Sequence, residues 1–485
     1  MIKTIKEDSH ILRIIVLFLW VLCTLWVRPW TGDLRSDPLT YACIAKDMVE
    51  HNNWFSPMLD GQPYLNKPPL YFWLVALSFK TLGFSVYAAK LPSLIFATIN
   101  VLLLYWIVYR FFKDYDLAFF SAFTFETTRW IIRNFATNRP ESLLVFSFLL
   151  GWLALILIQE RNRTGPYLLG ISFAIGIMSK IFFALFPSLL FLFYGIVTKK
   201  IYQWLRWKHF YYGCLIGIIL SLPWFIYFEK LHPGYIFYLI QEQTLNRITE
   251  GTDVSKDKLM YLKEFVMYYQ PYLIFFLIGF FLLLRKLRIE QYLFIFIAIM
   301  LFFLPLQLSE GKSDRYLTLV TPFFSFVTAM GIVHFEKIKK IAKGVTIYGV
   351  IPVFIFFWIT PVVTTSEKYQ VINLAERLSK SDLRDYTDAF SFIRTAEGNK
   401  SADIQFIEWS IRPRGQEHRC ALYFYLADSY VHWDNETFMR WVKEGNKPVV
   451  LITSKRSVKK LPQENVHWVE LKRDKYDVLL IGIKK

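Results

Sequence analysis

The sequence predicts an α-helical polytopic membrane protein that ends in a small soluble α/β domain. Three observations predict this architecture. Hydrophobic residues make up 54% of the 485 positions, which is more than one soluble core needs. Many apolar runs reach the length of about twenty residues that a helix needs to cross a hydrocarbon layer of roughly 30 Å. From about residue 366 the composition becomes that of a soluble domain.

Apolar runs at helical length predict about eleven membrane spans, and two further short helices extend the expected range to about eleven to thirteen. The first run is followed by Arg28, Pro29 and Trp30 and not by a small-residue cleavage site, so we expect a retained helix and not a signal peptide. The predicted spans are residues 11–27, 87–109, 117–135, 140–159, 166–180, 182–198, 210–228, 268–284, 290–306, 316–334 and 345–363.

The net charge of +17 would indicate nucleic-acid binding in a soluble protein, but the positions of the basic residues argue otherwise. They form short clusters beside the apolar runs, as in cytoplasmic loops under the positive-inside rule. We therefore expect a cytoplasmic N-terminus, and an odd number of spans then places the C-terminal domain across the membrane. The clusters lie near residues 3–13, 110–113, 161–163, 199–208, 285–288 and 337–343.

The first loop, residues 28–86, has two stretches with apolar residues at helical spacing, at 38–52 and 69–82. Each is too short or too polar to span, so we expect amphipathic helices along the membrane interface.

The predicted C-terminal domain, residues 366–485, combines strand-like and helical stretches. Neither a phosphate-binding loop nor a catalytic triad motif occurs in it, which favours a lid or a docking module. The predicted strands are 404–408, 421–426, 448–453 and 478–483, and the predicted helices are 371–379 and 436–443.

Charged residues gather at the face opposite the basic loops. Several cations with a few carboxylates suit a reaction that handles a lipid phosphate, because cations stabilise the charge on a departing phosphate. The plain alternative is a belt of charges facing lipid headgroups. Pro68 and Pro69 fix the backbone after Lys67, where a helix begins. The residues at this face are Asp33, Asp37, Tyr41, Lys67, Arg129, Arg133, Arg139, Glu141, Lys180, Arg247, Lys312, Asp314 and Arg315.

Three segments of the first loop, residues 36–42, 53–57 and 64–73, contain an acidic residue, a Trp-x-x-Pro step and a Lys-Pro-Pro helix start. In this order they resemble the first periplasmic loop of the GT-C glycosyltransferases, in the bacterial branch related to protein O-mannosyltransferases and to the lipid A aminoarabinose transferase. The resemblance continues over about residues 11–365. Its further motifs are residues 88–93, 138–144, 176–180, 223–224, 246–247 and 314–317 with Pro322.

This resemblance implies a GT-C fold in residues 1–365. It also implies transfer of a sugar, with inversion and without a nucleotide, from a polyprenyl phosphate, undecaprenyl in a bacterium. The acceptor would stand at the periplasmic face of the inner membrane. Lipid A, another glycolipid, a polysaccharide and a protein remain open as acceptors.

The resemblance makes Asp37 the base or the carboxylate that orients the acceptor; its alternative role is a cap for the helix near Pro38. Glu141 would be the second carboxylate, or only a complement to a helix dipole. The donor phosphate would be held by cations that could instead only snorkel to the interface. These cations are Lys67, Lys180, Arg247, Arg139, Lys312 and Arg315, and Tyr41, Asp33 and Tyr64 would position donor or acceptor.

One departure concerns Asn66, where the aminoarabinose branch commonly has an acidic residue. The histidines are not at ligand spacing either, so we expect neither a cofactor nor a metal site. Two other classes of function remain. A transporter or flippase of a lipid-linked solute predicts ionisable residues near span centres, but here they lie mostly at span ends. A non-catalytic scaffold predicts that substitution of Asp37 is tolerated.

Overall fold

The computed structural model describes residues 10–26, 34, 36–59, 61–242, 246, 259–309, 312–359, 405–408, 430–432, 435–444, 449–462, 466–473 and 477–484. The chain divides into two compact units. The first comprises residues 1–31, 47–58 and 62–362, and the second comprises residues 32–46, 59–61 and 363–485.

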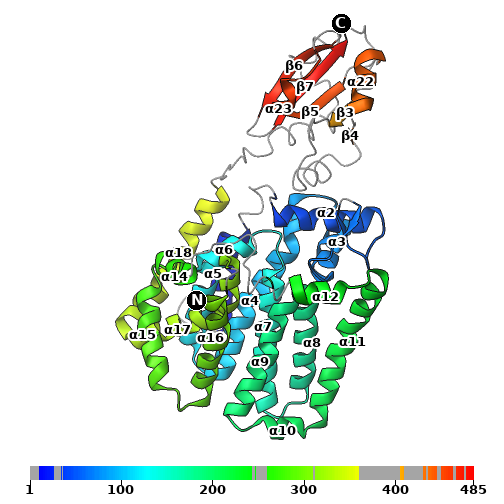
Figure 1. The fold of residues 1–485 in the computed structure, drawn as a ribbon. Helices are drawn as coiled ribbons and strands as arrows, with labels where there is room; N and C mark the ends of the chain where they lie inside the picture. The colour runs from blue at the N-terminus through cyan, green and yellow to red at the C-terminus, as the bar shows by residue number, and fades with distance from the viewer. Residues whose placement is uncertain are drawn as a thin grey trace. The chain divides into compact units, whose positions relative to one another are not determined.

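The first unit is mostly helical, as the sequence predicts (Figure 1). Its early elements, with α2 and β1 shared between the units, are α1 (His10–Val21), the π-helix η1 (Leu22–Trp26), α2 (Asp37–Glu50), β1 (Met58–Leu59), β2 (Gln62–Pro63), α3 (Leu70–Leu82), α4 (Val86–Phe112), α5 (Tyr115–Thr127), α6 (Arg129–Phe135) and α7 (Glu141–Gln159). The later elements are α8 (Thr164–Ser179), α9 (Ile181–Val197), α10 (Ile201–Leu205), α11 (Lys208–Leu231), α12 (Tyr235–Ile240), α14 (Met260–Tyr268), α15 (Leu273–Arg285), α16 (Glu290–Leu308), the 3-10 helix η4 (Asp314–Tyr316), α17 (Leu317–His334) and α18 (Glu336–Ile359).

Several helices are long and apolar enough to cross a membrane. Within the described residues five helices meet this condition, and α14 with α15 adds a sixth if that bent pair is one span. The five are Val86–Phe112, Glu141–Gln159, Lys208–Leu231, Glu290–Leu308 and Asp314–His334; shorter apolar helices are His10–Trp26, Leu70–Leu82, Thr164–Ser179 and Leu185–Val197. All of these helices fall on predicted spans or on the predicted loop helix at 69–82, while the total number of crossings stays a prediction.

Two predicted spans are interrupted. The span at 117–135 is divided into α5 and α6 at Thr128, whose backbone is extended at ψ 133°. The span at 268–284 is α15 with the end of α14, and the two helices bend by 114°. Hydropathy could not locate either break, because the sequence is largely apolar on both sides of it.

Helices α8 and α11 lie side by side (Figure 1), with glycines at their contact. A Cβ on Gly213 would collide with the carbonyl oxygen of Pro166, and one on Gly170 would collide with the carbonyl oxygen of Gly213. The two backbones therefore touch directly, as small residues allow between membrane helices.

We expect Gly213→Ala to destabilise the protein by about 1–3 kcal/mol, because the added methyl forces α8 and α11 apart. Thermal unfolding of the detergent-purified protein would measure this loss. Gly344→Ala in α18 is the matched control, since a Cβ there meets nothing within 4 Å. An unfolding temperature of Gly213→Ala equal to that of the control would contradict the close contact.

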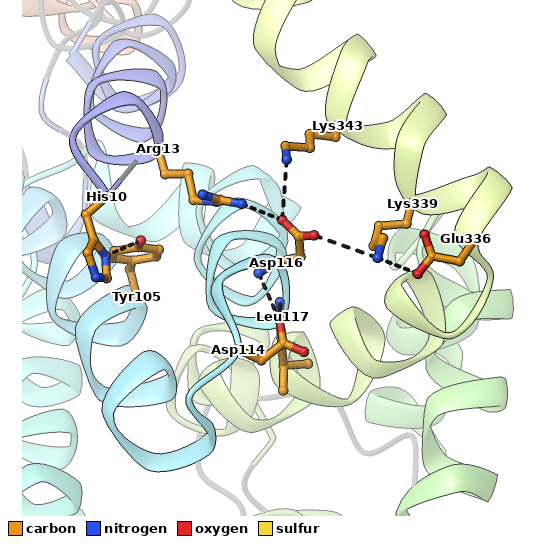
Figure 2. A network of polar contacts seen from close by, with 9 residues as sticks. All are labelled: His10, Arg13, Tyr105, Asp114, Asp116, Leu117, Glu336, Lys339 and Lys343. Atoms are coloured by element: carbon orange, nitrogen blue, oxygen red, sulfur yellow. Dashed lines mark hydrogen bonds and ion pairs between the residues drawn. The ribbon is translucent and has the colours of Figure 1, made fainter. Parts of the chain in front are cut away.

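The carboxylate of Asp116 in α5 contacts side chains of α1 and α18 (Figure 2). Arg13 Nη2 of α1 lies 2.7 Å from Asp116 Oδ1, and the Nζ atoms of Lys339 and Lys343 of α18 each lie 3.8 Å from a carboxylate oxygen. Arg13 is only 3% exposed, so its charge depends on this partner. Asp114 accepts hydrogen bonds of 2.9 Å from the backbone N–H groups of Asp116 and Leu117 and so starts α5.

The second unit contains a five-stranded sheet in the order β4-β3-β5-β7-β6. Strand β3 pairs in parallel with β4 and β5, and β7 is antiparallel to β5 and β6. The elements are β3 (Gln405–Glu408), β4 (Tyr430–His432), α22 (Asn435–Glu444), β5 (Val449–Ser454), α23 (Lys455–Val458), β6 (Val466–Arg473) and β7 (Asp477–Lys484).

Three of the predicted C-terminal strands coincide with β3, β5 and β7, and the helix predicted at 436–443 coincides with α22. Phe438 of α22 packs in one hydrophobic cluster with Val449 and Leu480 of the sheet. The stretches predicted at 371–379 and 421–426 lie outside the described residues. Strands β4 and β6 were not predicted.

Candidate functional site

Four helices of the first unit begin beside a cation. Lys180 is itself the N-cap of α9, and Arg139 directly precedes Pro140, the N-cap of α7. Arg315 directly precedes Tyr316, the N-cap of α17, and Lys67 stands two residues before Pro69, the N-cap of α3. Each proline fixes the backbone angle φ near the helical value, which explains why α3 and α7 begin where they do.

These cations surround the carboxylate of Glu141, in the first turn of α7. Glu141 is 2% exposed, and its Oε1 lies 3.5 Å from Lys180 Nζ. The positive charges of Lys180, Arg315, Arg139 and Lys67 all act on it. Four cations thus act on one buried carboxylate.

The helix dipoles act in the same direction as these positive charges. The N-terminus of an α-helix is the positive end of its dipole and presents free backbone N–H groups. An anion is stabilised there, whereas a cation is repelled by the same field. The cations at these four helix starts are thus repelled by the positive ends of the helix dipoles, which lowers the stability of the helices. An anionic ligand bound there would offset this repulsion. The arrangement fits binding of a phosphate better than it fits a purely structural role.

A chain of hydrogen bonds holds Arg139 in place. The hydroxyl of Tyr71 donates to Asn138 Oδ1 at 2.8 Å and lies 2.7 Å from Ser93 Oγ. Ser93 Oγ also donates to the carbonyl oxygen of Arg139 at 2.7 Å and accepts from its backbone N–H at 3.1 Å. Because Tyr71, Ser93 and Asn138 are buried, α3 and α4 fix the backbone directly before α7.

The other side of the cluster is formed by the segment before α17. Lys180 Nζ lies 4.7 Å from the ring centroid of Tyr316, a cation–π distance. The hydroxyl of Tyr261 accepts from the backbone N–H of Ser313 at 2.9 Å. Lys312 is buried, and its ammonium group donates to the carbonyl oxygen of Ser309. These contacts position η4, which includes Arg315.

The Trp-x-x-Pro segment of the first loop is hydrogen-bonded to helices α3 and α11. Trp73 Nε1 of α3 donates to the carbonyl oxygen of Trp54 at 2.5 Å, and Trp224 Nε1 of α11 donates to that of Phe55 at 3.0 Å. Asn66 Oδ1 accepts from the hydroxyl of Tyr238 in α12 at 2.7 Å. The residue before Lys67 is thereby attached to a later helix.

The remaining predicted site residues are Asp37, Tyr41, Tyr64, Asp33 and Arg247. Asp37, the first residue of α2, and the buried Tyr41 belong to the second unit. Tyr64 is half-buried, and its ring packs edge-on against Phe72 at 5.7 Å. Asp33 and Arg247 lie outside the described residues.

The structure adds Tyr71, Asn138 and Tyr316 to the residues chosen from the sequence. Each lies within a predicted motif, but nothing in its spacing distinguished it from an ordinary packing residue. Within the described part of the chain, no group of three or more His, Cys, Asp or Glu side chains has the geometry of a metal site.

Comparison with known proteins confirms the resemblance drawn from the sequence. Residues 66–227 match the family described as dolichyl-phosphate-mannose-protein mannosyltransferase. Three curated relatives are named undecaprenyl phosphate-alpha-4-amino-4-deoxy-L-arabinose arabinosyl transferase. The match is 26% identical over 44% of this chain in Pseudomonas savastanoi, 25% over 48% in an Enterobacter species, and 26% over 58% in Pseudomonas fluorescens. The matched segments span 40%, 43% and 52% of these relatives, about half of their length or less.

The fold matches that of two solved structures. ArnT from Cupriavidus metallidurans bound to undecaprenyl phosphate matches with a TM-score of 0.68 at 13% identity, over 97% of this chain and 98% of that one. ArnT from the same organism in the apo state matches with a TM-score of 0.67 at 14% identity, with the same coverage. The expected GT-C fold is thereby confirmed, while the number of spans is left open.

Proposed function

We propose that the protein is an inverting membrane glycosyltransferase that moves a sugar from undecaprenyl phosphate to an acceptor at the periplasmic face. The observation that most supports this proposal is the cluster of Lys67, Arg139, Lys180 and Arg315 around Glu141, at four helix N-termini. Its four positive side chains suit a phosphate that gains charge as it leaves. The ArnT match in complex with undecaprenyl phosphate supports the same donor.

The proposed reaction is a single displacement at the anomeric carbon. An acceptor oxygen forms a bond to this carbon from one face while the bond to the carrier phosphate oxygen breaks on the other, so the configuration inverts. The electron pair of the broken bond stays on the phosphate, where the cations stabilise it. A hydroxyl acceptor passes its proton to Asp37, whereas a phosphate acceptor is already ionised and Asp37 only orients it.

The remaining residues have supporting roles in this proposal. Lys67, Lys180 and Arg247 contact the donor phosphate, with Arg139, Lys312 and Arg315 as further cations. Glu141 forms an ion pair with Lys180. Its negative charge reduces the repulsion among the cations, because a buried charge needs a partner of opposite sign. Tyr41, Asp33 and Tyr64 position the donor or the acceptor.

The proposed location is the bacterial inner membrane, with a cytoplasmic N-terminus. Residues 1–365 form the catalytic domain, with a periplasmic first loop at 28–86 and eleven to thirteen spans, about the number that the apolar runs allow. Residues 366–485 form a periplasmic domain. The basic clusters beside the apolar runs support this orientation.

Mass spectrometry of envelope lipids and glycans tests the function. Cells that express the protein are compared with cells that lack it and with cells in which it is restored. We expect a sugar-sized mass on one acceptor class only when the protein is present. The first sugar to seek is 4-amino-4-deoxy-L-arabinose, for which the relatives are named. Identical spectra, with supply of the donor verified, would contradict transfer and favour transport or a scaffold.

A further inference from the structure

The two helix breaks in the first unit face each other across a cavity. The first break lies between α5 and α6 at Thr128, and the second lies between α14 and α15. The hydroxyls of Thr127 and Tyr272 lie 2.7 Å apart and join them. The cavity between them has a volume of about 520 Å³. It is lined by Thr127, Thr128, Arg129, Ile132, Arg133, Tyr268, Tyr269, Gln270 and Tyr272.

This cavity has a different lining from the cluster around Glu141. None of the four cations of that cluster lines it, and neither Arg129 nor Arg133 is among the charges that act on Glu141. The contact between α6 and α14 is aromatic, since the Trp130 ring stacks on Tyr269 at 5.5 Å and on Phe265 at 6.3 Å. Trp130 is buried while Arg129 and Arg133 are exposed, so α6 packs through one face and keeps both guanidinium groups on the other.

Among the described residues each guanidinium group has one specific contact, and the charge of Glu264 also acts on both. Arg129 Cζ lies 4.0 Å from the ring centroid of Tyr268, so its plane is held against an aromatic surface. Arg133 Nη1 lies 2.8 Å from Asp314 Oδ2. A guanidinium has five N–H donors in a fork that matches phosphate oxygens, and these contacts involve only part of them. The hydroxyls of Thr127, Thr128, Tyr269 and Tyr272 are already hydrogen-bonded within the protein, so the two guanidinium groups are the donors on which the site depends.

We propose that this cavity is a second anion site that binds a phosphate group through Arg129 and Arg133. The phosphate belongs either to a lipid headgroup or to free phosphate, and the chemistry of recognition is the same for both. The site is separate from the proposed donor site and does not depend on the proposed transfer reaction. The paired arginines, the volume and the polar lining at a break in an apolar bundle favour a phosphate over an apolar lipid tail.

Protection from phenylglyoxal, which modifies arginine side chains, tests this proposal residue by residue. The full-length protein, purified in detergent and delipidated, is treated alone, with dioleoylphosphatidylglycerol, with inorganic phosphate, and with oleate. Peptide mass spectrometry then reports each arginine separately. We expect phosphatidylglycerol at about four times its Kd to slow modification of Arg129 and Arg133 about fivefold, since only a fifth of the sites stay free. The exposed Arg288, between α15 and α16, should react at an unchanged rate.

The treatments with inorganic phosphate and with oleate decide whether the bound phosphate comes from solution or from a lipid headgroup, and whether a phosphate group is needed at all. Equal protection by inorganic phosphate would support the site and assign it to free phosphate. Equal protection by oleate would overturn the proposal, because charge without phosphate would suffice, and so would no protection in any arm. Arg129→Gln should remove the protection of Arg133, whereas Arg288→Gln should leave it intact. Persistent protection of Arg133 in Arg129→Gln would contradict a site built on both residues.

Discussion

Asp37→Asn is expected to lower the rate of sugar transfer by a factor of about 10²–10⁴, the usual contribution of a positioned acid or base. The amide keeps the size of the side chain but cannot accept a proton, and it loses the charge that would orient an acceptor. The reason to choose Asp37 is its place in the first of three loop segments that occur in the family's order. Transfer of labelled sugar from an undecaprenyl phosphate donor to the identified acceptor would measure the rate.

The control for this variant is Glu50→Gln, at the exposed end of the same helix α2. Both variants must express at the wild-type level, and Glu50→Gln should transfer at nearly the wild-type rate. Full transfer by Asp37→Asn would remove Asp37 from the chemistry and leave it the role of a helix-start residue. The proposal for the cationic cluster would stand, because it depends on other residues.

Lys67→Gln is expected to reduce kcat/KM for the lipid-linked donor by about 10²–10³, as loss of one group that stabilises developing charge does in other enzymes. Lys67 is the half-buried cation before α3. Its charge acts on Glu141 together with the charges of Lys180, Arg315 and Arg139. Because the charge on the carrier phosphate grows as the bond breaks, we expect the loss mainly in kcat. Steady-state kinetics with varied donor concentration would separate kcat from KM.

Lys80→Gln is the matched control, since Lys80 is an exposed cation in the last turn of the same helix α3. Its kcat/KM should stay close to that of the wild type. Lys67→Arg keeps the charge and should recover part of the activity, less than fully because the guanidinium is larger and planar. Activity of Lys67→Gln equal to that of Lys80→Gln would show that the lysine only faces headgroups.

The helical architecture could be predicted because hydropathy measures what a membrane requires. The predicted loop helices at 38–52 and 69–82 correspond to α2 and α3 within two residues. The breaks at Thr128 and between α14 and α15 could not be predicted, because apolar composition is the same in a straight and in a bent helix. Strand β6 was missed because His467, Glu470 and Lys472 interrupt its apolar residues, so that the sequence reads as a polar segment.

The candidate site was predicted from motifs and not from spacing. Lys67, Arg139, Glu141 and Lys180 were selected singly, each at a helix start, and only the fold shows that Lys67, Arg139 and Lys180 act on one carboxylate. Arg129 and Arg133 were grouped with them because all lie in the same stretch of sequence. The structure places these two on a cavity that the cations of the cluster do not line, since α6 turns their side chains away from its packed face.

The contacts of Asp116 have a consequence for the order of events during synthesis. Arg13 is made 103 residues before its carboxylate partner, and Trp20 donates a hydrogen bond to the carbonyl oxygen of Thr346, which follows 326 residues later. Helix α1 is thus inserted first but meets its last partner, α18, only when nearly the whole helical unit has been translated. Until then the guanidinium of Arg13 must stay in water or among headgroups, because an unpaired charge is costly in the hydrocarbon layer. Closure of the helical unit is therefore a late step, and a ribosome-stalled chain that ends before α18 should leave α1 accessible to aqueous thiol reagents at an engineered cysteine.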